Sequence, residues 1–244
     1  MGKRLRLKKM RQHTWSLDKM SKPINPNILN KKQQNIFFNH RCKHRHLYSE
    51  HPNCFRTEVL EKGGTLVEGY WDIETTGFEA NYHHLLSYVI KIKGTNDYYT
   101  ACITKEDLES GEFDKRICKQ LISDLNKFDV IYTYYGTGFD WKFARSRCMY
   151  WGLPFPEFGT LQHKDIYYMV KRLLKLHKSS LDAATHFLGI EGKNHVLGEE
   201  WMLARIGDKR GLKYVLEHNI LDCDILEKLH ERLENYAKLT TKSI

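Results

Sequence analysis

Residues 66–74, Leu-Val-Glu-Gly-Tyr-Trp-Asp-Ile-Glu, decide the fold because their pattern is typical of a strand with two different faces. Every second side chain of a strand points to the same face. One face therefore carries Asp72 and Glu74, and the other carries Trp71 and Ile73. Two carboxylates about 7 Å apart on one face repel each other and resist burial. A bound divalent cation would resolve this conflict, and a solvated acidic strand end is the alternative.

The pattern outside this strand predicts a mixture of strands and helices. Alternation and turn residues predict strands over residues 85–93, 98–104 and 129–134. Helical spacing predicts helices over residues 117–128, 139–151, 165–177, 180–188 and 211–236. Three successive strands, followed by helix, strand and further helices, indicate an α/β domain in which helices flank a mixed sheet.

Charge and composition divide the chain into three expected parts. They are a basic extended arm over 1–40, a Cys/His-rich segment over 41–64 and the α/β domain over 65–240. Residues 1–45 contain 13 Lys or Arg and one acid, a charge of +12, whereas the rest of the chain carries −3. Such an arm attracts phosphate backbones, and a targeting segment or a solubilising tail is the alternative. The candidate nucleic-acid contacts are Lys3, Arg4, Arg6, Lys8, Lys9 and Arg11.

Several classes of protein are excluded at this point. An apolar content of 41% is enough to form a sizeable core, which excludes a wholly disordered chain. No apolar run approaches the roughly 18 residues that span a bilayer, so we expect no membrane partner. The basic N-terminus is not followed by an apolar segment, so we expect no secretory signal. Four scattered cysteines are then expected to be buried thiols in a reducing, intracellular compartment, namely Cys102, Cys118, Cys148 and Cys223.

Three further ionisable residues are candidates for the same site as the strand carboxylates. Asp140 follows a turn broken by glycines and enters a predicted helix, where capping of the helix is the alternative role. His218 and Asp222 are four residues apart in the last predicted helix, where they interrupt its apolar stripe. A simple His–Asp contact at the rim of the domain is the alternative for this pair.

Taken in order, residues 71–77 (WDIETTG), 139–140 (FD) and 218–224 (HNILDCD) resemble the three exonuclease motifs of the DEDD superfamily. Members of that superfamily have a ribonuclease H-like fold, and they include polymerase proofreading domains and ribonuclease D. Within it, the chain is most similar to predicted 3′–5′ exonucleases of bacteriophages and bacteria. The resemblance covers about residues 66–233, and it implies an intracellular, cytoplasmic protein of a bacterium or a phage-infected cell.

The resemblance implies a metal-dependent 3′–5′ exonuclease. Asp72, Glu74, Asp140 and Asp222 would hold two Mg²⁺ or Mn²⁺ ions, which prefer hard carboxylate oxygens. His218 would accept the proton of the attacking water, because the ordinary histidine pKa of about 6.5 suits a base at neutral pH. The chain departs from the family in combining this histidine with the three-residue gap of the tyrosine subgroup.

The substrate expected from the resemblance is nucleic acid, with single-stranded DNA or fraying ends favoured over RNA. Two other functions stay open at this stage. One is a ribonuclease H-like endonuclease, and the other is a nucleic-acid-binding module whose catalysis has decayed. A replication or repair protein stays open as a partner, and the sequence does not identify which one.

The segment before the domain has a dense set of metal-ligand residues. Tetrahedral zinc needs four ligands, and five candidates lie within 13 positions. Cys42, His46, His51 and Cys54 have gaps of three, four and two residues, and His44 could replace His46. A segment this small and weakly apolar would need a structural Zn²⁺ to fold, and a disordered basic linker is the alternative.

Overall fold

The computed structural model describes residues 24–61, 63, 66–156, 161–192 and 197–237. These residues form two compact units that divide at residue 65, except that the short loop Lys43–Arg45 groups with the second unit. The candidate nucleic-acid contacts lie outside the described residues, and they are Lys3, Arg4, Arg6, Lys8, Lys9 and Arg11.

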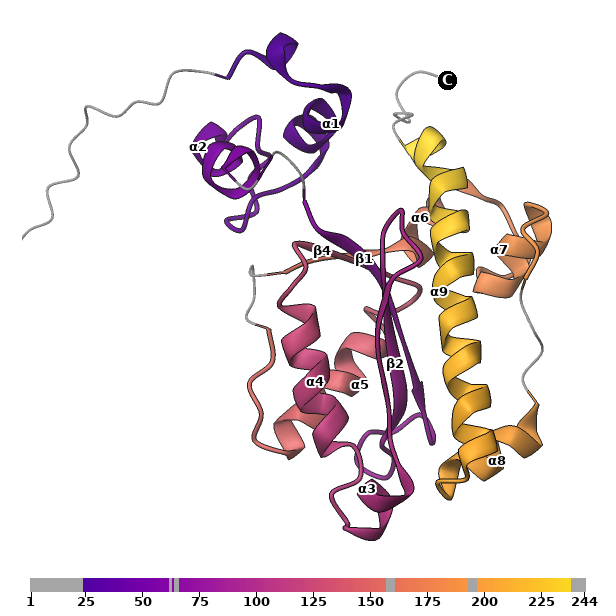
Figure 1. The fold of residues 1–244 in the computed structure, drawn as a ribbon. Helices are drawn as coiled ribbons and strands as arrows, with labels where there is room; N and C mark the ends of the chain where they lie inside the picture. Colours follow the sequence, from indigo (N-terminus) through magenta and orange to yellow (C-terminus); the bar gives the residue numbers. More distant parts are fainter. Residues whose placement is uncertain (1–23, 62, 64–65, 157–160, 193–196, 238–244) are drawn as a thin grey trace, which may run out of the picture. The chain divides into compact units, whose positions relative to one another are not determined.

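A five-stranded mixed sheet forms the centre of the larger unit (Figure 1). Its strands are β1 (Glu68–Thr75), β2 (Leu85–Ile92), β3 (Tyr98–Cys102), β4 (Val130–Thr133) and β5 (Gln162–Asp165). The strand order is β3-β2-β1-β4-β5. The first three strands form an antiparallel meander, whereas β4 runs parallel to both β1 and β5. The predicted α/β class with a mixed sheet is confirmed.

Helices cover both faces of this sheet. They are α3 (Lys105–Glu109), α4 (Lys115–Leu125), α5 (Asp140–Tyr150), α6 (Ile166–Leu173), α7 (Leu181–Phe187), α8 (Gly198–Arg205) and α9 (Lys209–Ala237). Figure 1 shows α9 along one face, with α4 and α5 on the opposite face. Among the described residues, no helix combines the length and apolar character that crossing a membrane requires.

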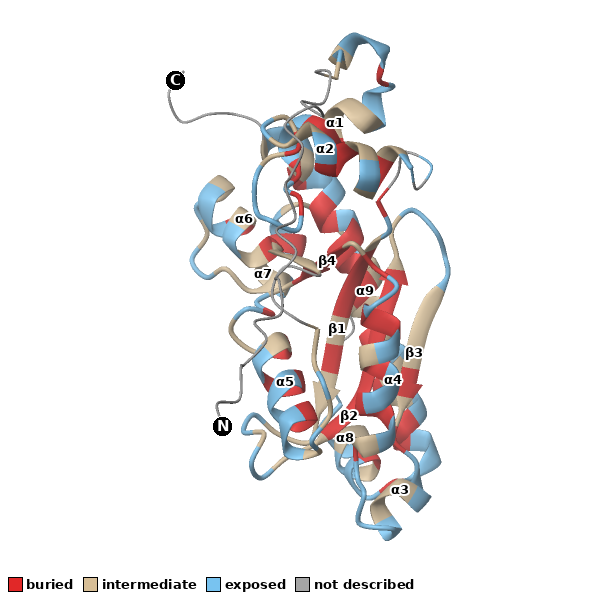
Figure 2. Ribbon diagram, turned by 90° about the vertical axis from the view of Figure 1, so that its left-hand side faces the viewer, coloured by how far each residue is buried: buried red, intermediate tan, exposed pale blue. Residues whose placement is uncertain are grey.

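The two faces of β1 point to different helices, as the alternation predicts. On one face, the Tyr70 hydroxyl lies 2.8 Å from Nδ1 of His230 in α9. On the other face, the Trp71 ring packs edge-on against Trp141 of α5, with 5.8 Å between ring centroids. Figure 2 shows buried positions concentrated on the central strands and on the helix faces turned toward them. Strand β1 is therefore buried on both sides, and its acidic end lies under α9.

Three elements of the larger unit were not predicted. Strand β5 consists of Gln162, His163, Lys164 and Asp165, all partly buried and polar, so it lacks the apolar alternation of a strand. Helix α3 has five residues, which is too short for helical periodicity to show. Helix α8 has one buried residue, Ala204, and a glycine at its first position, so its sequence carries little amphipathic signal.

The smaller unit contains a 3₁₀ turn, η1 (Pro26–Ile28), and three further elements, α1 (Lys31–Asn39), α2 (Pro52–Cys54) and the π-helical η2 (Phe55–Leu60). Helix α1 departs from the extended conformation that we expected through residue 40. Asn30 and Gln33 form a capping box that fixes its start. Phe37 then packs on Phe55, with 4.9 Å between ring centroids. Burial of Phe37 stabilises this helix, although the helical pattern of the segment is weak and the segment is rich in asparagine.

Candidate active site

The first two candidate ligands lie on β1, directly before an irregularity in the sheet. Asp72 is opposite Val89 and Glu74 is opposite Ser87, and the register with β2 shifts between Glu74 and Thr75. Bulges of this kind redirect a strand and are frequent next to active sites. Both carboxylates are half-buried, on the face of β1 that is turned toward α9.

Helix α9 places its ionisable pair over these carboxylates. Asn219 donates from Nδ2 to Ser87 Oγ over 3.1 Å, and Cys223 donates from Sγ to the Val89 carbonyl over 3.7 Å. Because Ser87 and Val89 are the β2 partners of Glu74 and Asp72, residues 218–223 lie beside the acidic end of β1. Glu74, His218 and Asp222 each contribute one ligand atom to a group in which these atoms lie within 4.8 Å of one another.

Asp140 reaches the site from the other face of the sheet. It is the first residue of α5 but not its cap, which is Phe139. Strand β4 pairs with β1 as far as Tyr70, and three residues later the Ile73 amide donates instead to Asp140 Oδ1 over 3.3 Å. Burial, together with the charge of Asp165, raises the pKa of Asp140 to about 7, although hydrogen bonds from its own amide and from the Ile73 amide lower it. The carboxylate thus occupies the edge of β1 between the positions of Asp72 and Glu74.

The turn that leads to Asp140 is held by a residue that the sequence did not single out. Asp165 accepts from the Tyr135 amide over 2.8 Å and from the Thr137 amide over 3.0 Å. Within this turn Tyr135 has a φ of 62°. A Cβ at Gly136 would lie 2.3 Å from the Thr133 hydroxyl, so the turn requires glycine there. Asp165 also caps α6, and the sequence signal for it was only a helix start.

Two aromatic residues enclose His218, and sequence reasoning missed both. The Trp201 ring of α8 meets the imidazole edge-on, with centroids 5.5 Å apart, and Tyr214 stacks on it at 6.3 Å. Trp201 Nε1 also donates to the carbonyl of Thr75, over 3.4 Å. His218 Nε2 lies 3.8 Å from Asp222 Oδ2. The imidazole is therefore 5% exposed and held between α8 and the end of β1.

The five candidate residues of the larger unit thus lie at one end of β1. Asp72 and Asp140 are outside the group formed by Glu74, His218 and Asp222. Both nevertheless lie close enough to the Cys223 thiol to affect its pKa. The pKa of Cys223 lies well above its usual value, first because of burial and then because of the charges of Asp72, Asp222, Asp224 and Asp140. A divalent cation would offset the repulsion within such a set of buried and half-buried carboxylates.

In the Cys/His-rich segment, the four side chains that lie together differ by one histidine from the set that the sequence favoured. Ligand atoms of Cys42, His44, His51 and Cys54 lie within 4.8 Å of one another. His46 is outside this group. Its backbone closes a hairpin turn by accepting from the Cys42 amide over 2.9 Å. Its ring instead packs edge-on against His51, with 5.2 Å between centroids.

Comparison with known proteins places the larger unit in a family. The sequence matches the family described as RNase_H superfamily over residues 69–234. The chain belongs to the RNase H superfamily. This family supports nucleic-acid nuclease activity for the domain, with nucleic acid as its substrate, and RNase H-like nucleases typically use divalent metals.

Two DNA polymerases are similar to parts of this RNase H-like chain. One, from Methanocaldococcus jannaschii, is 30% identical over 105 residues, which cover 35% of this chain and 6% of the polymerase. The other is the structure of the family B DNA polymerase from the hyperthermophilic archaeon Pyrobaculum calidifontis. It superimposes with a TM-score of 0.57 and 17% identity over 70% of this chain and 25% of that chain. At that identity the likeness concerns the fold alone, and the chain spans a quarter or less of either polymerase.

Proposed function

We propose that the larger unit is a divalent-metal-dependent 3′–5′ exonuclease. The observation that carries the proposal is that ligand atoms of Glu74, His218 and Asp222 lie within 4.8 Å of one another. Asp72 and Asp140 lie at the same end of β1. Three segments far apart in the sequence supply these residues, in the order expected of DEDD exonucleases. The sequence similarity to the DNA polymerase of Methanocaldococcus jannaschii supports a nuclease that acts on DNA.

The donor set fits magnesium or manganese ions. Asp72, Glu74, Asp140 and Asp222 offer hard carboxylate oxygens, and a nearby cation would favour the ionised form of Asp140, whose pKa burial raises to about 7. When bound, two such ions supply electrostatic stabilisation of the attacking and departing oxygens of the phosphodiester. This chain holds the ligands on a strand, a helix start and a long helix, which are rigid elements suited to fixed geometry.

His218 is the proposed acceptor of the proton from the attacking water. Its imidazole lies beside two of the proposed ligands, and Trp201 and Tyr214 restrict its rotation. Asp222, 3.8 Å from Nε2, would stabilise the imidazolium that forms. The same aromatic side chains exclude much of the bulk water, which strengthens the interaction of these charges.

The test is digestion of a 5′-labelled strand by the full-length protein in Mg²⁺ and in Mn²⁺, on DNA and RNA of one sequence. We expect a ladder of shortening products, formed faster from single-stranded DNA than from RNA. The matched controls are Asp72→Ala and Asp222→Ala, each of which should lower turnover by several orders of magnitude while strand binding persists.

Other product patterns would overturn the proposal in distinct ways. One internal cut at an early time would indicate a ribonuclease H-like endonuclease. An intact strand in both metals, with binding retained, would indicate a nucleic-acid-binding module. Near wild-type activity of Asp72→Ala would contradict the assignment of the metal ligands.

A further inference from the structure

The smaller unit has little apolar material with which to hold itself together. Among its described residues, the buried hydrophobic side chains besides the cysteines are Leu29, Ile36, Phe37, Tyr48, Phe55 and Val59. Small units with so few buried apolar side chains usually need a disulfide, a metal or a partner to fold. Neither Cys42 nor Cys54 is in a disulfide, although both are more than 90% buried. Two buried thiols in so small a core indicate a cross-link other than a disulfide.

Two local turns bring the four side chains of the cluster together. Residues Arg41 and Leu47 form an antiparallel bridge, and Arg45, with a φ of 68°, reverses the chain between them. Cys42 lies in this hairpin and His44 in its turn. Pro52 then starts helix α2, in which the Cys54 amide donates to the carbonyl of His51 over 3.0 Å. Each turn thus contributes one cysteine and one histidine.

The ligand atoms lie close enough together for a tetrahedral zinc site. Zinc bonds of about 2.3 Å to sulfur and about 2.0 Å to nitrogen, at the tetrahedral angle, place the two atoms about 3.5 Å apart. Cys42 Sγ lies 3.5 Å from His51 Nδ1. All ligand atoms of Cys42, His44, His51 and Cys54 lie within 4.8 Å of one another. Closure around an ion therefore needs shifts on the order of 1 Å.

The chemistry of the donor set selects the metal. Two thiolates and two imidazoles are soft or borderline ligands, which favour zinc over magnesium, manganese or calcium. The two thiolates neutralise the charge of the ion. Four protein ligands also complete its coordination, which is typical of a structural site rather than of a catalytic one. This cluster therefore differs in kind from the carboxylate set of the larger unit.

We propose that Cys42, His44, His51 and Cys54 bind one structural zinc ion that holds the smaller unit in its folded form. His46 supports the site by packing on His51 and is not a ligand. The site is separate from the proposed exonuclease centre, and it stands whether or not that centre is active.

The test measures metal content and ligand identity in the full-length protein. We expect about one zinc per chain by elemental analysis after dialysis against a weak chelator, and a thiolate-to-metal charge-transfer band after replacement of zinc by Co²⁺. Cys42→Ser, Cys54→Ser and His44→Ala should each lose the zinc. The matched control His46→Ala should retain it, as should Asp222→Ala, which alters only the carboxylate set.

Folding of the smaller unit gives an independent readout. Removal of zinc with a strong chelator should expose residues 24–61 to limited proteolysis while the larger unit stays protected, and added Zn²⁺ should restore protection. Wild-type protein with no more zinc than Cys42→Ser, and with no thiolate band in Co²⁺, would overturn the proposal. Loss of zinc from His46→Ala together with retention by His44→Ala would overturn the ligand assignment.

Discussion

At the scale of single residues, burial decides the chemistry of Asp140. The side chain is 4% exposed, and it accepts the Ile73 amide at the edge of β1. Burial raises its pKa to about 7, so a proton and a divalent cation compete for it near neutral pH. The position next to two other carboxylates makes this residue sensitive to both pH and metal.

The raised pKa of Asp140 predicts a pH-dependent stability of the metal-free protein. A carboxyl group whose folded pKa exceeds its unfolded value of about 4 stabilises the fold at low pH, and this contribution is lost as the pH rises through about 7. Asp140→Asn keeps the shape without the charge. We expect its free energy of unfolding in chelator to exceed that of wild type by on the order of 2–4 kcal/mol at pH 8, with a much smaller difference at pH 5.

Urea unfolding at both pH values, with and without Mg²⁺, checks this expectation. Saturating Mg²⁺ should stabilise wild type more than Asp140→Asn, because the ion binds the ionised carboxylate. Equal differences between the two proteins at pH 5 and pH 8 would contradict the role of burial at this residue.

The proposed role of His218 as proton acceptor leads to a second prediction at the scale of single residues. A general base contributes roughly 10²–10⁴-fold in rate, so His218→Ala should slow turnover by that factor while strand binding persists. The low-pH limb of the rate profile should be lost in this variant. The control is His186→Ala, an exposed histidine of α7 that should leave the profile unchanged. An unaltered low-pH limb in His218→Ala would assign the proton acceptor to another group.

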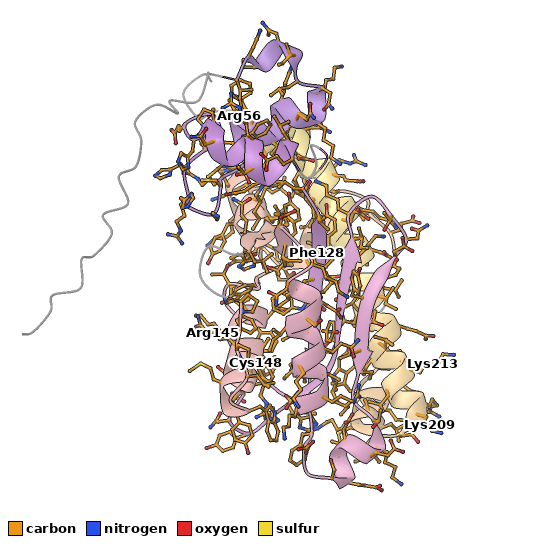
Figure 3. All side chains as sticks on the ribbon, turned by 60° about the vertical axis from the view of Figure 1, so that its left-hand side comes forward. Arg56, Phe128, Arg145, Cys148, Lys209 and Lys213 are labelled. Atoms are coloured by element: carbon orange, nitrogen blue, oxygen red, sulfur yellow. The ribbon has the colours of Figure 1, made fainter. Side chains whose placement is uncertain are left out.

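At the scale of elements, β1 packs closely against the segment that follows α4. Phe128, beyond the end of α4, lies next to the sheet in Figure 3, and a Cβ added at Gly69 would come within 2.6 Å of its ring. The aromatic ring therefore occupies the space that a side chain on β1 would need. This contact fixes how closely the segment after α4 approaches β1.

Gly69→Ala should destabilise the larger unit through this contact. Insertion of a methyl group into a packed core costs about 1–3 kcal/mol, because the ring of Phe128 or the strand must move. Gly198→Ala is the matched control, since a Cβ there meets nothing within 4 Å at the start of α8. Alanine is the better helix former, so this control should be neutral or stabilising by up to about 1 kcal/mol. Thermal and urea unfolding of both variants measure the contrast, and similar losses in the two would contradict it.

At the scale of the whole molecule, charge is separated along the chain. Residues 1–45 carry +12 and the remainder carries −3. The proposed catalytic residues all lie in the second part, which also contains the buried acidic site. The first part is therefore expected to attract nucleic acid, whereas the second carries out hydrolysis.

Deletion of residues 2–23 tests this separation without altering the described elements. It removes eight Lys or Arg and one acid. Each lost phosphate contact should flatten the slope of log affinity against log salt by roughly 0.7 for a single strand, so four lost contacts would lower it by about 3. Apparent KM should rise while kcat changes little, regardless of base sequence. Filter binding over a salt series measures the slope, and equal slopes for the two proteins would show that these residues do not contact phosphate.

Local spacing was enough to predict much of the fold and part of the site. The period of two in β1 placed Asp72 and Glu74 on one face, and the spacing of α9 placed His218 and Asp222 on its sheet-facing stripe. These inferences hold because the backbone geometry of a strand or helix determines which neighbouring side chains share a face. The mixed α/β sheet followed from the order of such elements.

Only the tertiary structure decided which distant groups meet. Asp140 pairs with the Ile73 amide, Asp165 holds the turn before it, and Trp201 closes on His218. Likewise the hairpin turn, and not the number of intervening residues, brings His44 rather than His46 to the two cysteines. These contacts depend on which distant segments of the chain meet and on how their side chains pack. A local sequence pattern determines neither of these.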